Sequence, residues 1–341
     1  MKTGRVVLLT MVALLLAVTG CKKDDPQRVD VPVTTIDAVG EIGFLQWSPD
    51  GTRLAGASQA DRLSVWDVES GETVFAYAFD AWLGGLCWTY DGEQLVAGFE
   101  SGDLVVWDPA TGEELRRRSH NPEAWGRANG FTAVACSPTS PLIATGQLAG
   151  DFAIWDSSDW DAGPRPIQQY RWPVDGLIWR PDGAYIGETH FTTLNMWRIA
   201  DYTVIQELGG IAGDSTHMAF SPDGASLVVG NAVGGVNHWN IITGEKEMIS
   251  SGSVSSNHYG GQIVGVGWSP AGHVFASASN NGRIIIWEAA TNHRLFFLRT
   301  PRRIASMDWS PTADVLAMGG RHEIMLMDLS DILPEPPEGE N

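Results

Sequence analysis

The chain has 341 residues, of which 43% are hydrophobic and 18% are charged, a composition typical of a folded protein with a large core. Its formal net charge is −19, and removal of residues 1–20, which carry two bases and no acid, leaves 20 basic against 41 acidic residues, or −21. Such a surface repels phosphate backbones, so we expect no nucleic-acid partner.

The N-terminus has the pattern of a secretion signal. Lys2 and Arg5 precede an apolar run from Val6 to Val18 that only Thr10 interrupts. This run is shorter than the ~20 apolar residues that span a bilayer, but it suits the apolar region of a signal peptide. We therefore expect residues 1–20 to be a cleaved signal peptide.

The end of this run, Val18-Thr19-Gly20-Cys21, resembles the lipobox of bacterial lipoproteins, in which small residues precede a lipid-modified cysteine. The resemblance implies cleavage before Cys21, a diacylglycerol on its sulfur and usually an acyl chain, such as palmitate, on its amine. Two or three acyl chains anchor a protein stably, whereas one chain is marginal. The charged residues that follow suit a tether, so we expect a lipidated tether over 21–30.

This interpretation places the protein on the cell membrane or outer membrane, held by lipid and facing the periplasm or the cell exterior. The alternative is an ordinary secretory signal followed by a chance cysteine. The chain has only three cysteines, which favours the lipoprotein interpretation.

From residue 40 onward the sequence repeats itself, with two anchors in each repeat. The first anchor precedes a Ser-Pro-Asp-Gly-like turn, and successive copies lie 41, 48, 43, 41, 48 and 41 residues apart. The second anchor, a Trp-Asp-like pair, follows 18 or 19 residues later. A period in the low forties is that of a four-stranded propeller blade. The first anchors are Trp47, Trp88, Cys136, Trp179, Phe220, Trp268 and Trp309, and the second anchors are Trp66, Trp107, Trp155, Trp197, Trp239, Trp287 and Met327.

Each repeat predicts four strands, named a to d. Strand a ends at the first anchor, and proline and glycine then supply the φ angles of a tight turn into strand b. Strand c ends at the second anchor, as in Arg283–Trp287, whose apolar residues face both sides. The seventh repeat continues into prolines and lacks a strand d. We therefore expect Val31–Val39 to be the fourth strand of the last blade, which closes the ring.

These motifs resemble the WD-repeat family over roughly residues 31–330. The resemblance implies an all-β fold, a seven-bladed β-propeller of four-stranded antiparallel blades, followed by a disordered, acidic, proline-rich tail over 331–341. Family repeats often carry an aspartate in the b–c turn that joins a hydrogen-bonded tetrad with histidine, Ser/Thr and Trp. No repeat has this aspartate, so we expect the tetrad to be absent and the blades to depend on packing. The turn position holds Ala60, Ser101, Ala149, Phe191, Val233, Asn281 and Arg321.

Cys87 and Cys136 fall on the inner strands of adjacent predicted blades. Their positions place them either both in the gap between the two blades or both away from it. Packed sheets lie ~10 Å apart, which argues against a disulfide. We therefore expect buried free thiols.

No catalytic motif is present, and the eight histidines have no ligand spacing. We therefore expect no enzyme activity, no cofactor and no metal. The leading hypothesis is a membrane-anchored scaffold that binds other proteins through a propeller rim, as the resemblance implies. The alternative is an envelope propeller with a small-ligand or hydrolase-like site in its central channel. The d–a connections vary in length, and variable loops on a constant scaffold commonly bind partners. Their interface-type residues are the candidates: Trp82, Trp125, Trp172, His258, Tyr259, Arg302 and Arg303.

Overall fold

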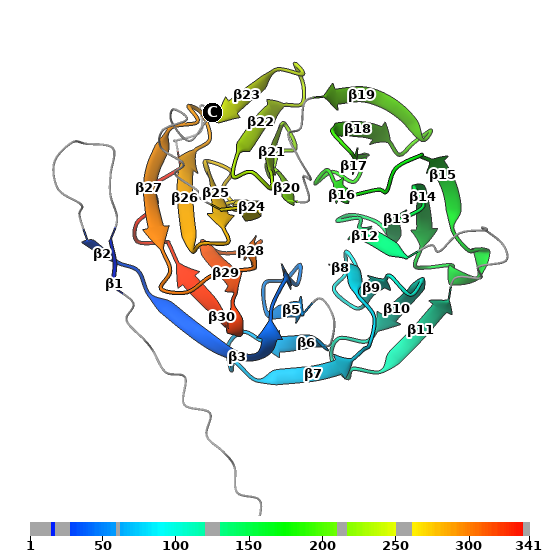
Figure 1. Cartoon of the computed structure of the whole chain (residues 1–341), viewed down its shortest axis with the longest axis horizontal. Coiled ribbons are helices and arrows are strands. Elements are labelled where there is room, and N and C mark those ends of the chain that lie inside the picture. Colours follow the sequence, from blue (N-terminus) through cyan, green and yellow to red (C-terminus); the bar gives the residue numbers. More distant parts are fainter. Residues whose placement is uncertain are drawn as a thin grey trace, which may run out of the picture.

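In a computed structural model of the chain, seven four-stranded antiparallel sheets form a ring, which confirms the all-β, seven-bladed propeller (Figure 1). The structure describes residues 15–17, 28–58, 62–119, 130–209, 217–249 and 261–336. In each blade strand a lies innermost and strand d outermost. The alternation of strand and turn residues therefore set both the number of blades and their order.

The first three blades follow the predicted repeats closely. Blade 1 consists of β4 (Phe44–Trp47), β5 (Arg53–Ala57), β6 (Arg62–Asp67) and β7 (Thr73–Ala78). Blade 2 consists of β8 (Leu83–Trp88), β9 (Leu95–Phe99), β10 (Asp103–Trp107) and β11 (Glu114–Ser119). Blade 3 consists of β12 (Phe131–Cys136), β13 (Leu142–Gln147), β14 (Asp151–Asp156) and β15 (Arg165–Gln169), with the 3₁₀ helix η1 (Trp160–Ala162) between its last two strands.

The next three blades have the same arrangement. Blade 4 consists of β16 (Gly176–Trp179), β17 (Tyr185–His190), β18 (Thr193–Arg198) and β19 (Thr203–Gly209). Blade 5 consists of β20 (His217–Phe220), β21 (Ser226–Gly230), β22 (Val236–Asn240) and β23 (Lys246–Ile249). Blade 6 consists of β24 (Ile263–Trp268), β25 (Val274–Ser279), β26 (Arg283–Glu288) and β27 (Arg294–Arg299).

Blade 7 joins the two ends of the folded chain. Its strands β28 (Ser306–Trp309), β29 (Val315–Gly319) and β30 (Arg321–Asp328) are completed by β3 (Val33–Glu41), which pairs with β30. The closing strand predicted over Val31–Val39 is thus confirmed, with bounds shifted by two residues. Val31, Val33 and Ile36 are buried, because this strand supplies the apolar cover that the seventh repeat lacks.

Three of the seams between neighbouring blades share one kind of hydrogen bond near the channel. In each case the donor is the indole Nε1–H of a first-anchor tryptophan. The acceptor is a backbone carbonyl in the preceding blade, in the residue just before that blade's own first anchor. Trp88 donates to Gln46 O at 3.3 Å, and Trp268 donates to Ala219 O at 3.0 Å. The third instance is Trp179 to Ala135 O at 2.9 Å. The anchor tryptophans therefore link blades to one another as well as filling the core.

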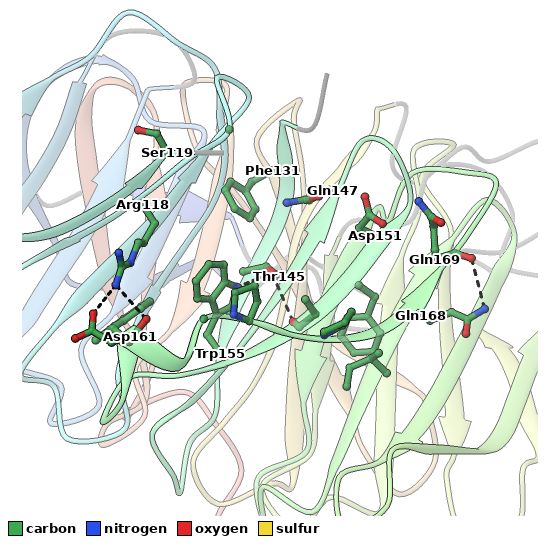
Figure 2. Close-up of a pocket in the computed structure, with 18 residues that line it drawn as sticks. Arg118, Ser119, Phe131, Thr145, Gln147, Asp151, Trp155, Asp161, Gln168 and Gln169 are labelled. Carbon is green, nitrogen blue, oxygen red and sulfur yellow. Dashed lines mark hydrogen bonds and ion pairs between the residues drawn. The ribbon is translucent and has the colours of Figure 1, made fainter. Parts of the chain in front are cut away.

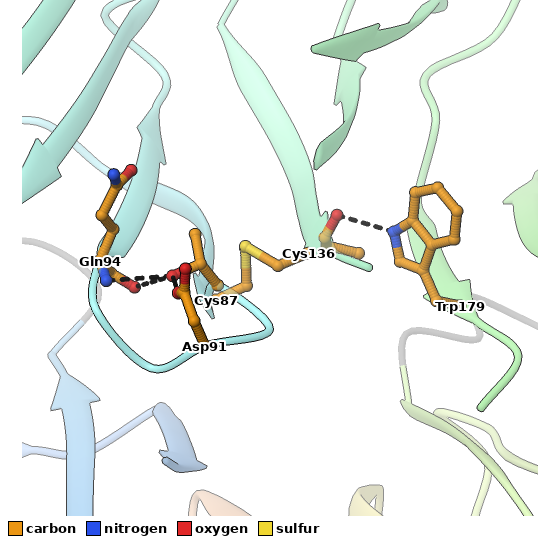
Figure 3. The surroundings of a disulfide bond; sticks show 7 residues. Cys87, Asp91, Gln94, Cys136 and Trp179 are labelled. Atoms are coloured by element: carbon orange, nitrogen blue, oxygen red, sulfur yellow. Dashed lines mark hydrogen bonds between the residues drawn. A yellow bond between two sulfur atoms is a disulfide. The ribbon is translucent and has the colours of Figure 1, made fainter. Parts of the chain in front are cut away.

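The seam between blades 2 and 3 departs from this pattern in two ways. Its outer part holds a cavity of about 570 Å³ between β11 and the outer strands of blade 3 (Figure 2). Its inner part carries a disulfide between Cys87 and Cys136, with Cα atoms 5.6 Å apart (Figure 3). The expectation of free thiols is therefore wrong.

The physical reason for this correction is a close approach of the inner strands β8 and β12. A Cβ atom added at Gly84 would lie 1.8 Å from Phe131 O, and one at Gly85 would lie 2.4 Å from Val134 N. Two glycines thus let the backbones meet at a spacing well below the ~10 Å of packed sheets. Cys136 occupies the position that an anchor tryptophan holds in most other blades. Its disulfide with Cys87 takes the place of the hydrogen bond that such a tryptophan donates to the preceding blade.

Two blades retain part of the hydrogen-bonded tetrad that the sequence appeared to lack. Trp155 Nε1 donates to the Thr145 hydroxyl at 3.0 Å, and Trp287 Nε1 donates to the Ser277 hydroxyl at 2.8 Å. The expectation that all blades depend on packing is therefore wrong for blades 3 and 6. In these two blades the hydrogen bond between the tryptophan indole and the Ser or Thr hydroxyl forms without the turn aspartate.

Outside the propeller, β1 (Leu15–Ala17) pairs with β2 (Arg28–Asp30) as a short antiparallel pair. In the segment predicted as a tail, Ile332 and Leu333 pack against the core of blades 6 and 7, and His273 Nε2 lies 2.8 Å from Pro334 O. Within the described residues, no helix has the length and apolar composition that crossing a bilayer requires.

Candidate interaction surface

One rim of the propeller is formed by the b–c turns and the d–a connections, which are joined by backbone hydrogen bonds. Glu100 N donates to Trp82 O at 2.8 Å, and Asn280 N donates to Gln262 O at 2.9 Å. We call this face the connection rim. The arrangement agrees with what the family resemblance implies for these two kinds of loop.

Large apolar side chains are exposed on the connection rim. They lie at its b–c turns and d–a connections, and each is at least half exposed. Apolar side chains on several blades of one face form a surface suited to a protein partner. The five side chains are Trp82, Leu148, Trp172, Phe191 and Val233.

Trp172 and Phe191 form the clearest aromatic feature of this rim. Their rings stack with centroids 5.5 Å apart and an interplanar angle of 17°. Trp172 is 51% exposed and Phe191 is 63% exposed, so the stack presents its outer faces to solvent. Rigid aromatic side chains lose little conformational entropy on binding and are enriched at interface hot spots.

The backbone at Phe191 is held in an unfavourable conformation. Its φ is +56°, a left-handed value that bulky residues rarely adopt. The Phe191 N–H donates to Asp175 Oδ2 at 2.8 Å, which fixes the turn. A strained turn that projects an exposed aromatic ring is a feature of functional sites, where the surrounding structure compensates for the strain.

A buried polar cluster supports this turn from below. Glu188 is fully buried, and its two carboxylate oxygens contact His190 Nδ1 at 3.0 Å and Asn195 Nδ2 at 3.1 Å. The His190 ring stacks on Tyr170 with centroids 4.1 Å apart. Burial raises the pKa of Glu188 and, together with the nearby Glu188 carboxylate, raises that of Tyr170. The cluster therefore joins the d–a connection of Trp172 to the b–c turn of Phe191.

The remaining described candidates lie on the same rim but at other seams. Trp82 is 52% exposed at the seam between blades 1 and 2. Arg302 pairs with Glu323 at 2.8 Å, and Arg303 Nε donates to Asn280 O at 3.3 Å. Arg302 thus ties the d–a connection to β30 of blade 7, and Arg303 ties it to the b–c turn of blade 6.

Several predicted residues fall outside the described residues: Cys21, Trp125, His258 and Tyr259. The described candidates Trp82, Trp172 and the consecutive pair Arg302–Arg303 lie in three different d–a connections. Trp172 stacks on Phe191, the residue that occupies the turn position of the missing aspartate in blade 4. An aromatic residue at a turn position that favours Asp or Gly was the signal that could have identified it.

The opposite rim, formed by a–b turns and c–d connections, has a different character. Its aspartates hydrogen-bond to their own turns: Asp67 Oδ1 accepts from the N–H and the hydroxyl of Ser70, and these bonds lower the Asp67 pKa. Asp223 accepts from the Ser221 hydroxyl in the same manner. These acids therefore build turns, and the few exposed large apolar side chains here include Tyr90 and Ile242.

The described residues contain no group of three or more His, Cys, Asp or Glu side chains placed to bind a metal ion. His217 lies on the inner strand β20, and burial lowers its pKa to about 4. A histidine with this pKa is neutral at neutral pH.

A comparison with protein families gives a match to one repeat. The family model described as WD domain, G-beta repeat, matches residues 250–288. The described part of this segment consists of β24, β25 and β26 of blade 6. The match and the seven-bladed ring together support the WD-repeat β-propeller family, whose members are typically non-enzymatic scaffolds.

Proposed function

We propose that this protein is a non-enzymatic scaffold of the bacterial cell envelope that binds a partner protein through its connection rim. The observation that carries the proposal is the exposed Trp172–Phe191 stack on a turn that is strained and supported from below. The opposite rim has carboxylates committed to their own turns, so it offers fewer groups to a partner. The seven-bladed ring and the family match are consistent with a protein-binding role.

The test compares two rims of one protein. Trp82, Trp172 and Phe191 are replaced together with Ala, and the matched control replaces Tyr90 and Ile242 on the opposite rim with Ala. Proteins are recovered from detergent-solubilised membranes on each tagged variant and identified by mass spectrometry. We expect the connection-rim variant to lose a partner that the wild type and the control retain. Equal recovery on all three would contradict the proposal.

We further propose that the lipid-modified residue is Cys21, which anchors the propeller to the membrane. The Cys87–Cys136 disulfide supports a location outside the cytoplasm, because disulfides persist in oxidising compartments. Replacement of Cys21 with Ser is expected to move the protein from the detergent phase to the aqueous phase on phase partitioning. A Cys21→Ser protein that remains in the detergent phase would refute the anchor.

A further inference from the structure

The seam between blades 2 and 3 contains a cavity beside a c–d connection that departs from the repeat. Its volume of about 570 Å³ falls within the ~300–1,000 Å³ of small-molecule sites. It lies between the end of β11 and the face of β14 and β15 (Figure 2). The c–d connection beside it, residues 157–164, is longer than its counterpart in blade 1, residues 68–72, and contains η1.

The walls of this cavity are fixed by contacts across the seam. Trp160 is buried and packs on Trp155, with ring centroids 6.0 Å apart. Arg118 of blade 2 contacts Asp161 at 2.7 Å and also donates to Trp160 O at 3.2 Å. With the disulfide at the inner end of the seam, these contacts give a cavity with preorganised walls, which lowers the entropic cost of binding a ligand.

Three glutamines supply most of the free hydrogen-bonding capacity of the cavity. The side-chain amides of Gln147 and Gln169 have no hydrogen-bond partner among the described residues, and Gln168 Nε2 reaches only Gln169 O, at 3.5 Å. Each amide presents both donors and acceptors. Phe131, Trp155 and the prolines Pro164 and Pro166 supply apolar surface between these polar groups.

The charges of the lining exclude several classes of ligand. Arg118 is the one cation among the lining residues, and it is paired with Asp161. The cavity therefore offers an anionic ligand no cation that is not already paired with a carboxylate. A purely apolar ligand would leave the amides without hydrogen bonds, which costs free energy.

We propose that this cavity binds a neutral saccharide. Sugar hydroxyls both donate and accept, which matches side-chain amides, and the C–H faces of a sugar ring pack on apolar and aromatic side chains. The Arg118–Asp161 pair bounds one side of the cavity, and Gln168 and Gln169 bound the other (Figure 2).

Binding is tested by isothermal titration calorimetry on the purified full-length protein. Four neutral trisaccharides are titrated separately: maltotriose, cellotriose, laminaritriose and chitotriose. We expect at least one of these sugars to bind. The double variant Gln147→Ala with Gln169→Ala is expected to weaken binding about tenfold, equivalent to ~1.4 kcal/mol. The control is Gln206→Ala on β19, the outer strand of blade 4, which should bind like the wild type with an unchanged melting temperature.

A second variant fills the cavity without removing a polar group. Ala153→Leu on β14 places a larger side chain among the lining residues and should abolish sugar binding while the protein remains folded. Binding of trigalacturonic acid more tightly than any neutral trisaccharide would overturn the neutral-ligand assignment. Failure of all four neutral probes, or binding that neither variant changes, would overturn the site itself.

Discussion

Two seams of the ring solve the same packing problem with different chemistry. Between blades 2 and 3 the link is covalent: Cys87, just before the first anchor of blade 2, forms a disulfide with Cys136, the first anchor of blade 3. Between blades 7 and 1, the corresponding residues are Asp308 and Trp47, and the Trp47 N–H donates to Asp308 Oδ2 at 2.9 Å. The two seams are thus linked at the same position of the repeat, while the bond formed there depends on the residues present.

The seam between blades 7 and 1 has an additional requirement, because the ends of the folded chain meet there. The Ser306 hydroxyl donates to Ile42 O at 2.7 Å, and β3 packs Ile36 into a core with Trp47 and Ile324. These contacts are non-covalent and involve residues far apart in the sequence. We therefore expect the ring to open at this seam more readily than at the disulfide seam.

The largest expected effect comes from removal of the closing strand. Deletion of residues 31–41 exposes the edge of β30 and removes Val31, Val33 and Ile36 from the core. Each buried apolar side chain is worth ~1.5–3 kcal/mol, so the total approaches the stability of a typical domain. We expect loss of the cooperative transition in differential scanning calorimetry.

Deletion of residues 22–27 is the matched control for this experiment. It removes chain from the same end but leaves β3 intact, so its transition should match that of the wild type. A strand-deleted protein that melts at the wild-type temperature would show that β3 does not stabilise the ring.

The second expected effect concerns the disulfide seam. Replacement of Cys87 and Cys136 with Ser opens a covalent loop whose cysteines are 49 residues apart, for which chain entropy gives ~4 kcal/mol. We expect a lower midpoint of guanidinium denaturation. Dithiothreitol should lower the midpoint of the wild type to a similar extent and leave the double variant unchanged. If dithiothreitol also lowered the denaturation midpoint of the double variant, the loss of stability would have a cause other than this disulfide.

These two seams also show what the sequence could and could not predict. The spacing of the anchors fixed the number of blades, and the prolines after Asp328 together with the apolar residues before Phe44 identified the closing strand. The disulfide was missed because the distance between two sheets depends on which side chains separate them. Gly84 and Gly85 remove that separation at one seam, and only the packed structure shows that they face β12.

The candidate site was predictable at the level of the rim but not of its contacts. Repeat geometry placed Trp82 and Trp172 on the connection rim, and their exposure of about half is consistent with that placement. The stack with Phe191 depends on the left-handed backbone of one turn and on the buried Glu188 beneath it. Glu188 lies in the middle of β17, and the periodicity of that strand gives no signal that its carboxylate is buried beneath the turn.

The third prediction addresses the carboxylate at the seam between blades 7 and 1. Burial raises the pKa of Asp308 to about 7, despite the two backbone N–H groups that it accepts. The folded protein therefore binds a proton between about pH 4 and 7 that the unfolded chain has released. This contribution to stability is complete below pH 4 and is lost as the pH rises through 7.

Asp308→Asn should remove that pH dependence. Because Asp308 is only partly shielded from solvent, we expect a modest effect of about 1–2 kcal/mol. In urea denaturation at several pH values, the variant should gain stability relative to the wild type between pH 5 and 8. Asp80→Asn, in an exposed d–a connection, is the control and should leave the profile unchanged. Parallel profiles for Asp308→Asn and the wild type would contradict the assignment.

The smallest expected effect tests whether the indole bonds link blades as the disulfide does. Trp179 Nε1 donates to Ala135 O across the seam between blades 3 and 4, whereas Trp309 Nε1, at the equivalent position of blade 7, is buried with no partner among the described residues.

Replacing either residue with Phe removes the same N–H group. In Trp179→Phe a carbonyl loses its donor, which costs ~1 kcal/mol, or a melting temperature lower by roughly 2 °C. In Trp309→Phe the same packing is lost but the N–H group that is removed was unsatisfied, so this variant should lose less stability than Trp179→Phe. Equal losses in the two variants would mean that indole packing, not the bond across the seam, is what the anchor tryptophans contribute.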